Sequence, residues 1–331
     1  MGIIMGKLLQ AGGARISYLV RPNRLERLSR PQVLYSFDDH RLTHFTGYEI
    51  LTDPGRIERD AYDYVIFTID GIALRSVEGQ ALVRQVGEIA RGTHTKVLIG
   101  TMGVDLRRNF LSLSGLDPSQ VFNGGLYILV YQADRVTLPL HPPTDAGLLA
   151  QADFAHRQAA PMGFFVDESA PEAARAFAGL WEASGESQCV VLSEEAFSTQ
   201  VPAVFALFVA CDIMGWPSWR DMHTDPGLWE LAAEATREIQ GLSINGETGQ
   251  QARQATTAQG LIDMWRALEE ETLPADLLEF NRFHHGGKVY EQDVELLRDC
   301  AALGHAEGKS MAALEQLIER SRAARRERGS R

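Results

Sequence analysis

The sequence is poor in cysteine and has no long apolar run. Its 331 residues include only three cysteines, Cys189, Cys211 and Cys300, whose spacing suggests neither a metal site nor a disulfide framework. No apolar run approaches the roughly 18 residues that a membrane span requires. Lys7 and Arg15 interrupt the apolar N-terminus, which makes it a poor signal peptide. These absences favour a soluble protein of the reducing cytoplasm.

Positive charge is also scarce. The chain has 32 Lys and Arg against 44 Asp and Glu, a formal net charge of −12, which argues against a general nucleic-acid or anionic-membrane binder. The sequence shows no internal repeat and no obvious linker rich in Pro, Gly or Ser. Its length is sufficient for a sizeable core and predicts two domains.

The start of the chain has the pattern of a helix, a glycine turn and a strand. Gly2 and Gly6 lie four residues apart on one helical face, where they let that face lie against a neighbouring backbone. Gly12 and Gly13 are suited to end the helix, and Ile16–Val20 has the β-branched and aromatic residues of a strand. This order is typical of the second half of a βαβ dinucleotide-binding unit.

In such a unit the last glycine of a G-x-G-x-x-G turn opens the helix, and Gly2 is placed to be that glycine. We therefore expect an apolar strand ending in G-x-G-x to be encoded before Met1. Without it we expect a gap at the centre of the sheet and a weakened pyrophosphate site at the helix N-terminus. An ordinary helix punctuated by glycines is the alternative interpretation of this stretch taken alone.

The first half of the sequence alternates strands with helices. Apolar strands are predicted at Tyr64–Ile69 and Lys96–Thr101, with a shorter extended stretch at Tyr48–Thr52. Val77–Ala90 carries its apolar residues on one helical stripe. Near-continuous apolar strands separated by helices predict an α/β, Rossmann-type doubly wound parallel sheet covered on both faces. We expect Ile16–Val20 and Tyr64–Ile69 to share that sheet.

The pattern changes further along the chain. Leu126–Tyr131 and Arg135–Leu140 are predicted to form a hairpin, and Gly163–Val166 and Gln188–Leu192 to be strands on either side of a helix at Ala170–Ser184. Long helices follow, at Phe197–Met214, Gly227–Gln240, Gln250–Leu268, Asp276–Phe283, Gln292–Leu303 and Met311–Ala324.

We therefore place a domain boundary after residue 194, between an α/β domain (1–194) and an all-α domain (195–331). The Arg-rich tail from Arg320 to Arg331 is interpreted as a frayed, solvated helix end, with docking of an acidic partner as the alternative.

Basic residues follow the predicted strand Ile16–Val20. The segment contains Arg21, Asn23 and Arg24, and no acidic residue occurs before Glu26. Units that bind NAD usually hold a carboxylate at about this place for the ribose hydroxyls, whereas a basic residue favours the 2′-phosphate of NADP. The segment predicts NADP over NAD, with a solvated basic turn as the alternative.

Two more stretches follow predicted strands directly. Thr68 and Ile69 end one strand, and Met102 and Gly103 come just after the next. The carboxyl ends of strands line the ligand crevice of doubly wound sheets. We therefore predict cofactor binding at these four residues, together with Gly2 and the basic segment, although Gly103 is also interpretable as an ordinary turn glycine.

The most distinctive run, EFNRFHHGGKV, lies near the C-terminus. Adjacent histidines on a helix point in different directions, so we expect no metal site here. The simplest structural interpretation is a helix closed by Gly286 and Gly287, with imidazoles near its C-terminal dipole. The functional interpretation makes Glu279, His284 or Lys288 a proton donor or a carboxylate binder.

Taken together, these features resemble the ketopantoate reductase family over nearly the whole chain. The residues that carry the resemblance are Gly2 and Gly6 opening a helix, Ala11-Gly12 before the strand, Arg21, Arg24 and Leu28 after it, Tyr62-Asp63-Tyr64-Val65 at the next apolar strand, and Gly103. The resemblance implies a Rossmann domain that binds NADP, a helical domain, and an active site in the cleft between them. It also implies NADPH-dependent reduction of a small 2-oxo acid, by default 2-dehydropantoate to pantoate in pantothenate biosynthesis.

The chain departs from the family at the catalytic positions. Asp70 stands where the family has a lysine, and Met102 where it has an asparagine. The family's proton-donating lysine, on the first helix of the helical domain, has no counterpart, because no lysine occurs between Lys96 and Lys288. We therefore expect the donor in the segment from Glu279 to Lys288, with Glu279 near the position of the family's late glutamate.

Two functions follow from this resemblance. The first is an NADPH-dependent reductase, and the second is a catalytically silent relative that binds a dinucleotide or acts as a scaffold. The expected partners are a small-molecule substrate and, as a candidate assembly, a second copy in a homodimer; nucleic acid and membrane are not expected.

Overall fold

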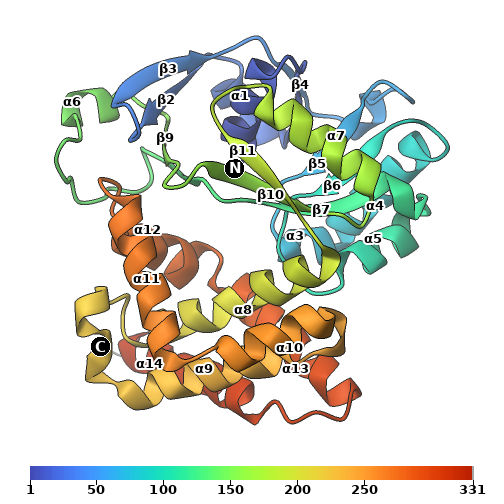
Figure 1. The fold of residues 1–331 in the computed structure, drawn as a ribbon. Coiled ribbons are helices and arrows are strands. Elements are labelled where there is room, and N and C mark those ends of the chain that lie inside the picture. Colours follow the sequence, from blue (N-terminus) through green and yellow to red (C-terminus); the bar gives the residue numbers. More distant parts are fainter. Residues whose placement is uncertain (330–331) are drawn as a thin grey trace. The chain divides into compact units, whose positions relative to one another are not determined.

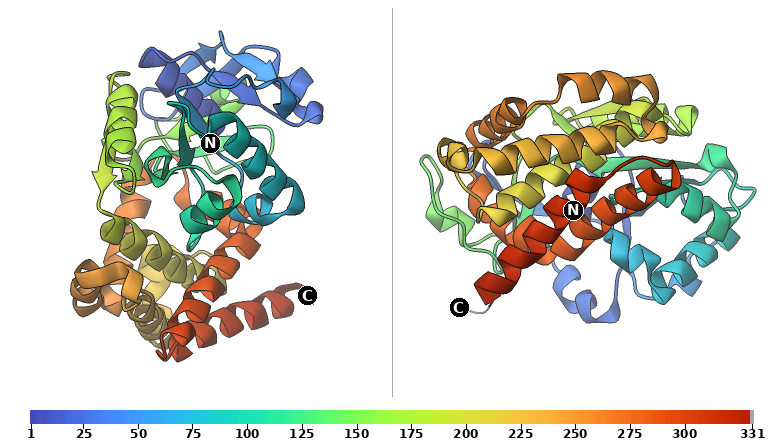
Figure 2. Two further views of the ribbon diagram at one scale, coloured as in Figure 1. Left: turned by 90° about the vertical axis from the view of Figure 1, so that its right-hand side faces the viewer. Right: turned by 90° about the horizontal axis from the view of Figure 1, so that it is seen from below.

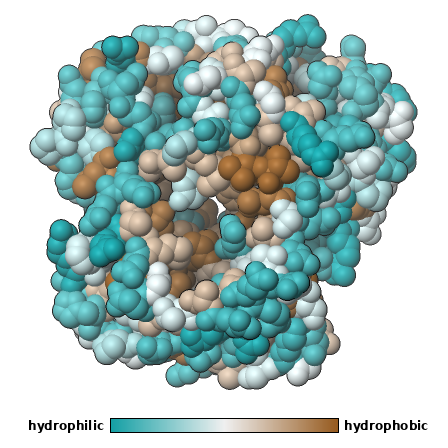
Figure 3. All heavy atoms as spheres, viewed as in Figure 1, coloured by the Kyte–Doolittle hydropathy of each residue, from teal (hydrophilic) through white to brown (hydrophobic). Residues whose placement is uncertain are grey.

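The structure is a computed structural model and describes residues 1–329 (Figure 1). The chain forms two compact units. The first comprises Met1–Thr101 and Asp105–Leu192, and the second comprises Met102–Val104 and Ser193–Arg331. The first unit is α/β and the second is helical, as the sequence predicts. Hydrophilic residues cover most of the face shown in Figure 3, and apolar residues gather in only a few places on it.

The α/β unit contains the following helices and strands in chain order: α1 (Gly2–Ala11), β1 (Ser17–Leu19), α2 (Leu25–Leu28), β2 (Gln32–Ser36), β3 (Arg41–Phe45), β4 (Glu49–Leu51), β5 (Tyr64–Phe67), α3 (Gly71–Arg75), α4 (Val77–Ala90), β6 (Lys96–Ile99), α5 (Leu106–Ser114), β7 (Val121–Leu126), β8 (Leu129–Gln132), α6 (Ala146–Leu149), β9 (Phe154–Arg157), β10 (Met162–Asp167), α7 (Pro171–Glu182) and β11 (Gln188–Leu192).

The main sheet has five strands in the order β11-β10-β7-β6-β5. Strands β5, β6 and β7 are parallel, whereas β10 is antiparallel to β7 and β11 is parallel to β10. The prediction of a wholly parallel sheet is therefore wrong for two strands. A parallel connection needs a crossover of a dozen or more residues, usually a long helix. Between β7 and β10 the chain instead runs through β8, the four-residue helix α6 and β9.

A second sheet, in the order β3-β2-β9-β8, was not predicted. In it β8 pairs antiparallel with β9, so the predicted hairpin of Leu126–Tyr131 with Arg135–Leu140 is wrong. The turn after Gln132 does form, with the Arg135 N–H donating to the Gln132 carbonyl at 3.0 Å. Residues 136–140 form no strand, because Pro139 has no N–H to give to a sheet.

The strands β1 and β5 lie in different sheets. β1 forms a two-stranded parallel sheet with β4, and β5 pairs with β6. Neither has a second neighbour among the described strands. The prediction that they share one hydrogen-bonded sheet is therefore wrong, because no described strand bridges them. The gap that we expected in the sheet is present between β1 and β5.

Helix α1 joins these two strands through packing rather than through a ladder. Tyr18 Oη on β1 donates to the Gly2 carbonyl at 3.0 Å, and a Cβ at Gly2 would lie 3.5 Å from Thr68 Oγ1, just past β5. A Cβ at Gly6 would lie only 1.9 Å from Tyr18 Oη, so this position requires glycine. The glycine face of α1 thus meets an aromatic side chain, not the backbone that the sequence led us to expect.

The main sheet is covered on both faces, as predicted. Alternate residues of β6 point to opposite sides, so Val97 and Ile99 share a core with α3, α4 and α5, while Leu98 packs with α1 and α7. In Figure 1, α7 lies along β10 and β11. Burial on both faces explains why the sequences of these strands are apolar without alternation.

The helical unit consists of α8 (Glu194–Ile213), α9 (Pro226–Gln240), α10 (Gly246–Ala255), α11 (Ala258–Thr272), α12 (Leu277–Phe283), the π-helical turn η6 (His284–Lys288), α13 (Tyr290–Ala306) and α14 (Ala312–Gly329). The single helix predicted at Gln250–Leu268 is two helices. Thr257 leaves the helical conformation and its hydroxyl accepts the Gly260 N–H at 3.0 Å, which begins α11.

Helix α8 is the central helix of this unit. It starts three residues before the predicted Phe197, because the Ser193 hydroxyl caps it by accepting the Ala196 N–H. By length and composition alone it is apolar enough to cross a membrane, contrary to our reading of the sequence, but half of its apolar window is buried inside the protein. A helix that is apolar on all sides is expected at the core of a helical bundle.

The Arg-rich tail is docked on the chain itself. Arg325 and Arg328 of α14 both bind the Asp212 carboxylate, and Arg320 pairs with Asp225. Figure 2 shows α13 and α14 side by side. The interpretation of this segment as a frayed, solvated helix end is therefore wrong up to Gly329, since acidic residues of the same unit pair with its arginines. Residues 330–331 lie outside the described part.

Candidate functional site

The N-terminus of α1 is a candidate anion site in the α/β unit. The first N–H groups of a helix have no partner within it, and the helix dipole places partial positive charge there. Gly2 contributes no side chain and the first turn contains no acidic residue. Thr68 lies beside it and is exposed. This end of the helix can accept a phosphate group.

Free cations stand directly after β1. Arg21 and Asn23 are exposed, Arg24 is half-buried, and Pro22–Arg24 forms the short 3-10 helix η1. Within the described residues, neither arginine side chain has an ion pair or a hydrogen bond. Two guanidinium groups without a counter-charge at the end of a strand suit a phosphate ligand.

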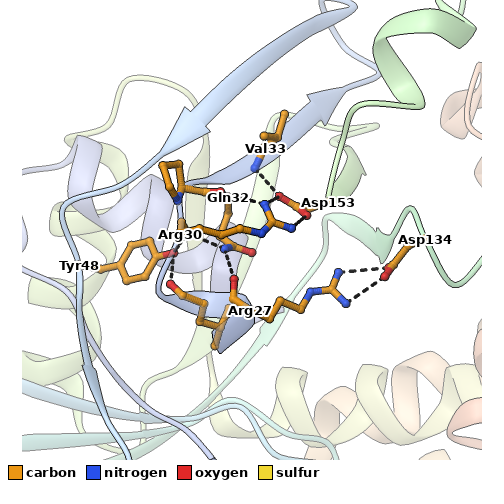
Figure 4. Close-up of polar contacts among 9 residues, drawn as sticks. Arg27, Arg30, Gln32, Val33, Tyr48, Asp134 and Asp153 are labelled. Carbon is orange, nitrogen blue, oxygen red and sulfur yellow. Dashed lines mark hydrogen bonds and ion pairs between the residues drawn. The ribbon is translucent and has the colours of Figure 1, made fainter. Parts of the chain in front are cut away.

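The next two arginines along the chain, Arg27 and Arg30, each form an ion pair (Figure 4). Arg27 binds Asp134 through both terminal nitrogens at 3.1 Å, and Arg30 binds Asp153 in the same two-pronged way. Asp153 also accepts the Val33 N–H at 2.9 Å. These pairs hold the segment after β1 against the second sheet, so Arg27 and Arg30 are structural.

The Arg30–Asp153 pair predicts a pH dependence of stability. Burial raises the pKa of the Asp153 carboxyl, but the hydrogen bonds from Arg30 and the Val33 N–H outweigh it and leave the pKa below its usual value. The stabilisation is therefore complete above the unfolded-state pKa of about 3.9 and disappears as the pH falls through the lower folded-state value.

We expect Asp153→Asn to lower the free energy of unfolding by about 1–2 kcal/mol at pH 7. The difference from the wild type should begin to shrink below about pH 4 and should disappear once the pH is below the lowered folded-state pKa, where the Asp153 carboxyl is neutral in the folded protein as well. Denaturant titrations at several pH values measure it. Asp134→Asn is the matched control, because its carboxylate is 58% exposed and should contribute little. A stability difference that stays constant as the pH falls into the acid range would contradict a lowered pKa of Asp153.

The other predicted residues near the strand ends have distinct positions. Ile69 packs into the core with α3, α4 and α5, so only its backbone is free for a ligand. Asp70 caps α3 by accepting the Ala73 N–H at 2.8 Å, which gives this carboxylate a structural role where the resemblance leads one to expect a lysine. Met102 and Gly103 belong to the helical unit, and Met102 packs against its core.

The run near the C-terminus does not end a helix as predicted. Helix α12 continues into η6, so Gly286 lies within a π-helical turn. A Cβ at Gly286 would lie 2.5 Å from Trp216 Nε1, so glycine is required to admit the indole. Single π-helical turns are frequent at functional sites.

The three predicted catalytic residues of this run, Glu279, His284 and Lys288, lie in different surroundings. Glu279 pairs with Arg282 at 3.3 Å and Lys288 is exposed. His284 stacks on Phe280 with ring centroids 5.3 Å apart, and burial together with neighbouring positive charge lowers its pKa well below the usual value. No cluster of three or more potential metal ligands occurs among the described residues.

The structure joins a pair of residues in this region that the sequence did not indicate. His285 Nδ1 lies 2.7 Å from Asp293 Oδ2, and the ring of His285 packs 4.2 Å from that of Phe208. The aspartate lies eight residues further on, in the first turn of the next helix. No local spacing rule connects the two residues, so sequence alone offered no signal.

Comparison with known proteins shows what fold these units form. A crystallised 2-dehydropantoate 2-reductase from Geobacter metallireducens has a similar structure over 98% of this chain and 96% of its own, with a TM-score of 0.66 and 15% identity. The fold is that of the ketopantoate reductases. The 2-dehydropantoate 2-reductase from Methylococcus capsulatus agrees, with 13% identity, a TM-score of 0.63 and coverage of 96% and 91%.

The ketopantoate reductase fold also includes another kind of dehydrogenase among the similar structures. D-mandelate dehydrogenase, solved with NADH and anilino(oxo)acetate, has 10% identity and a TM-score of 0.63 over 98% of this chain and 95% of its own. No family model and no curated protein matches the sequence. At these identities the likeness establishes the fold and leaves the substrate open.

Proposed function

We propose that the protein is an NADPH-dependent reductase of the ketopantoate reductase type, acting on a 2-oxo acid. The similar structures include enzymes named for 2-dehydropantoate and for D-mandelate, one of them solved with NADH and an oxo acid derivative. The observation that carries the choice of NADPH is the pair of uncompensated cations, Arg21 and Arg24, at the end of β1. Reduction of 2-dehydropantoate to pantoate is the default reaction.

The residues of the α/β unit fit such a nucleotide. Arg21 and Arg24 would bind the 2′-phosphate, with Asn23 beside them, and the N–H groups at Gly2 would face the pyrophosphate. Thr68 and Ile69 would contact the rest of the nucleotide, mainly through their backbones; Met102 and Gly103, which belong to the helical unit, are proposed for the same role. When bound, the reduced nicotinamide supplies a hydride. We assign nucleotide binding to residues 1–194 and substrate binding to residues 195–331.

The segment from Glu279 to Lys288 would bind the substrate. Lys288 is exposed and has no ion pair within the described residues, so it suits the carboxylate of a 2-oxo acid. Glu279 and His284 are proposed to contact polar groups of the substrate. The protein's own contribution is to hold the carbonyl near the nicotinamide and to supply a proton.

A second candidate is a catalytically silent relative that binds the nucleotide without reducing a substrate. Two observations favour it: Asp70 is occupied as a helix cap, and no lysine occurs between Lys96 and Lys288. A protein that lost its catalytic groups would still keep the cation pair for the nucleotide.

The test combines binding and turnover. NADPH binding is followed by fluorescence, and NADPH oxidation is measured with 2-dehydropantoate, pyruvate, 2-oxoisovalerate and phenylglyoxylate. Binding with turnover of at least one acid supports the reductase. Binding without turnover supports the silent relative, and absence of NADPH binding rejects both.

We also infer a cytoplasmic location, because all three cysteines are free and buried, as suits a reducing compartment. A homodimer remains a proposal, with the helical unit as its contact; sedimentation of the purified chain tests it.

A further inference from the structure

One histidine of the helical unit is anchored by a buried carboxylate. The bond from His285 Nδ1 to Asp293 joins η6 to the first turn of α13. The Asp293 side chain is 2% exposed and that of His285 is 16% exposed. His285 Nε2 makes no hydrogen bond within the described residues, yet it is not among their fully buried side-chain atoms that lack a partner, so this nitrogen keeps some exposure. One ring nitrogen is therefore held in the interior while the other is open to a ligand.

The surroundings of this histidine are unusual for a purely structural residue. Its ring packs against Phe208 and lies within 6.4 Å of the Trp216 ring. Trp216 has a φ of +62°, a left-handed conformation that is strained for a bulky side chain, and its indole N–H has no acceptor among the described residues. The π-helical turn is a second departure from regular structure. Features that cost free energy and converge on one titratable group mark candidate functional sites.

Burial determines where the protons of the pair reside. It raises the pKa of the Asp293 carboxyl well above its usual value and lowers the pKa of His285 to about 3. Both directions favour the uncharged form of the pair, in which the carboxyl proton faces Nδ1 at 2.7 Å and the ring proton is on Nε2. Charged or titratable groups on the neighbouring elements are His284 and Lys288 on η6, Asp212 on α8, and Arg325 and Arg328 on α14, where both arginines bind Asp212.

An uncharged pair of this kind can act as a general acid. As Nε2 releases its proton, the carboxyl proton of Asp293 moves to Nδ1, so the ring never becomes an imidazolate. The negative charge that results resides on the Asp293 carboxylate, which is hydrogen-bonded to Nδ1. In this uncharged form the pair can deliver a proton without first being protonated from solvent.

We propose that His285 donates the proton to the carbonyl oxygen of the substrate and that Asp293 is its positioning residue; this rests on the reductase function proposed above. In the balanced step the carbonyl carbon gains a hydride from the reduced nicotinamide, and the carbonyl oxygen gains the Nε2 proton. The carbonyl π bond is replaced by a C–H and an O–H bond. The products are a 2-hydroxy acid, the oxidised nicotinamide and a deprotonated pair that regains its proton from water.

The proposal explains how a chain with no lysine between Lys96 and Lys288 could still reduce a carbonyl group. It also distinguishes between the adjacent histidines. His284 has only ring stacking against Phe280 and His285, whereas His285 has a carboxylate behind it that can replace the proton it gives away.

The kinetic test uses His285→Gln, with His223→Gln as the matched control, because His223 is exposed on the 3-10 helix Trp219–Thr224 of the same unit. With the 2-oxo acid from the panel that the wild type turns over, we expect His285→Gln to lower kcat about 100-fold or more, and His223→Gln to change it less than about threefold. The Kd for NADPH should stay the same in both. If His285→Gln keeps kcat within about threefold of the wild type, the proposal is wrong and the reductase function stands.

A second variant separates positioning from folding. In Asp293→Asn the amide cannot pass a proton to Nδ1, so His285 must first be protonated. We expect kcat of this variant to increase toward acid pH, whereas wild-type kcat is flat through neutral pH. A merely structural role would lower stability and leave the pH profile unchanged, which would overturn the assignment of Asp293.

A measurement on the protein without substrate tests the proton location directly. In ¹⁵N NMR spectra at pH 7, the Nε2 of His285, assigned by comparison with His285→Gln, should carry a proton. An unprotonated Nε2 at this pH would exclude proton donation whatever the activity. Absence of turnover by the wild type on the whole panel would instead reject the proposed function itself, so the two failures are distinguishable.

Discussion

Replacing Arg21 and Arg24 together by alanine should remove the preference for NADPH over NADH. Both side chains follow β1 and have no ion pair within the described residues, so in the free protein nothing competes for them. A hydrogen bond to a charged group contributes about 1.5–3 kcal/mol when shielded, and less when exposed. For two partly exposed contacts we expect the Kd for NADPH to increase about 30- to 100-fold.

The Kd for NADH should change little, because NADH has no 2′-phosphate for these side chains to contact. Fluorescence titration of both nucleotides measures the ratio of the two affinities. Arg84→Ala is a suitable control, since Arg84 is exposed on α4 and bonded only to Gln80. Raising the salt concentration should weaken NADPH binding to the wild type more than to the double variant. If the double variant bound NADPH and NADH more weakly by the same factor, the arginines would not be recognising the 2′-phosphate.

Removing Arg325 and Arg328 together should destabilise the helical unit strongly. Their side chains are 33% and 42% exposed, whereas the Asp212 carboxylate that they share is 6% exposed. Arg325 also donates to the Gly286 carbonyl at 2.8 Å and lies over the Tyr290 ring. The double alanine variant would leave a buried carboxylate without a partner, which costs about 3–5 kcal/mol.

Replacing Asp212 should reduce the free energy of unfolding less than replacing its two arginines. In Asp212→Ala the two arginines lose their partner but can turn toward water, so we expect a loss of about 1–2 kcal/mol. Arg322→Ala with Arg326→Ala is the control on the same helix, because both residues are exposed there. Chemical denaturation of the full-length chain measures the free energy of unfolding in each case. If Asp212→Ala destabilised the protein more than the double arginine variant, the burial argument would be wrong.

Part of the fold could be predicted because the signals are local. The helix α4 has the predicted bounds Val77–Ala90, since its apolar stripe repeats with the period of the helix. The strand β11 also has its predicted bounds, Gln188–Leu192. The change from α/β to helical structure was predicted for the same reason. Hydrophobic periodicity is a property of neighbouring residues and does not depend on the rest of the chain.

The pairing of strands was harder to predict. The hairpin expected at residues 126–140 does not form, because β8 finds its partner in β9, more than 20 residues along the chain. A strand sequence specifies which faces are buried, but not which other strand lies beside it. The antiparallel direction of β10 and the separation of β1 from β5 are likewise set by the path of the whole chain.

Among polar residues, the sequence by itself determined which side chains the chain has for binding and catalysis. It placed Arg21 and Arg24 after a strand, and it showed that the family's lysine has no counterpart. Only the tertiary structure decided that Arg27 and Arg30 are paired. It alone joined His285 to Asp293. The reason is physical: an ion pair or a buried hydrogen bond depends on distance and burial in space, and residues far apart in sequence acquire both only when the core has packed.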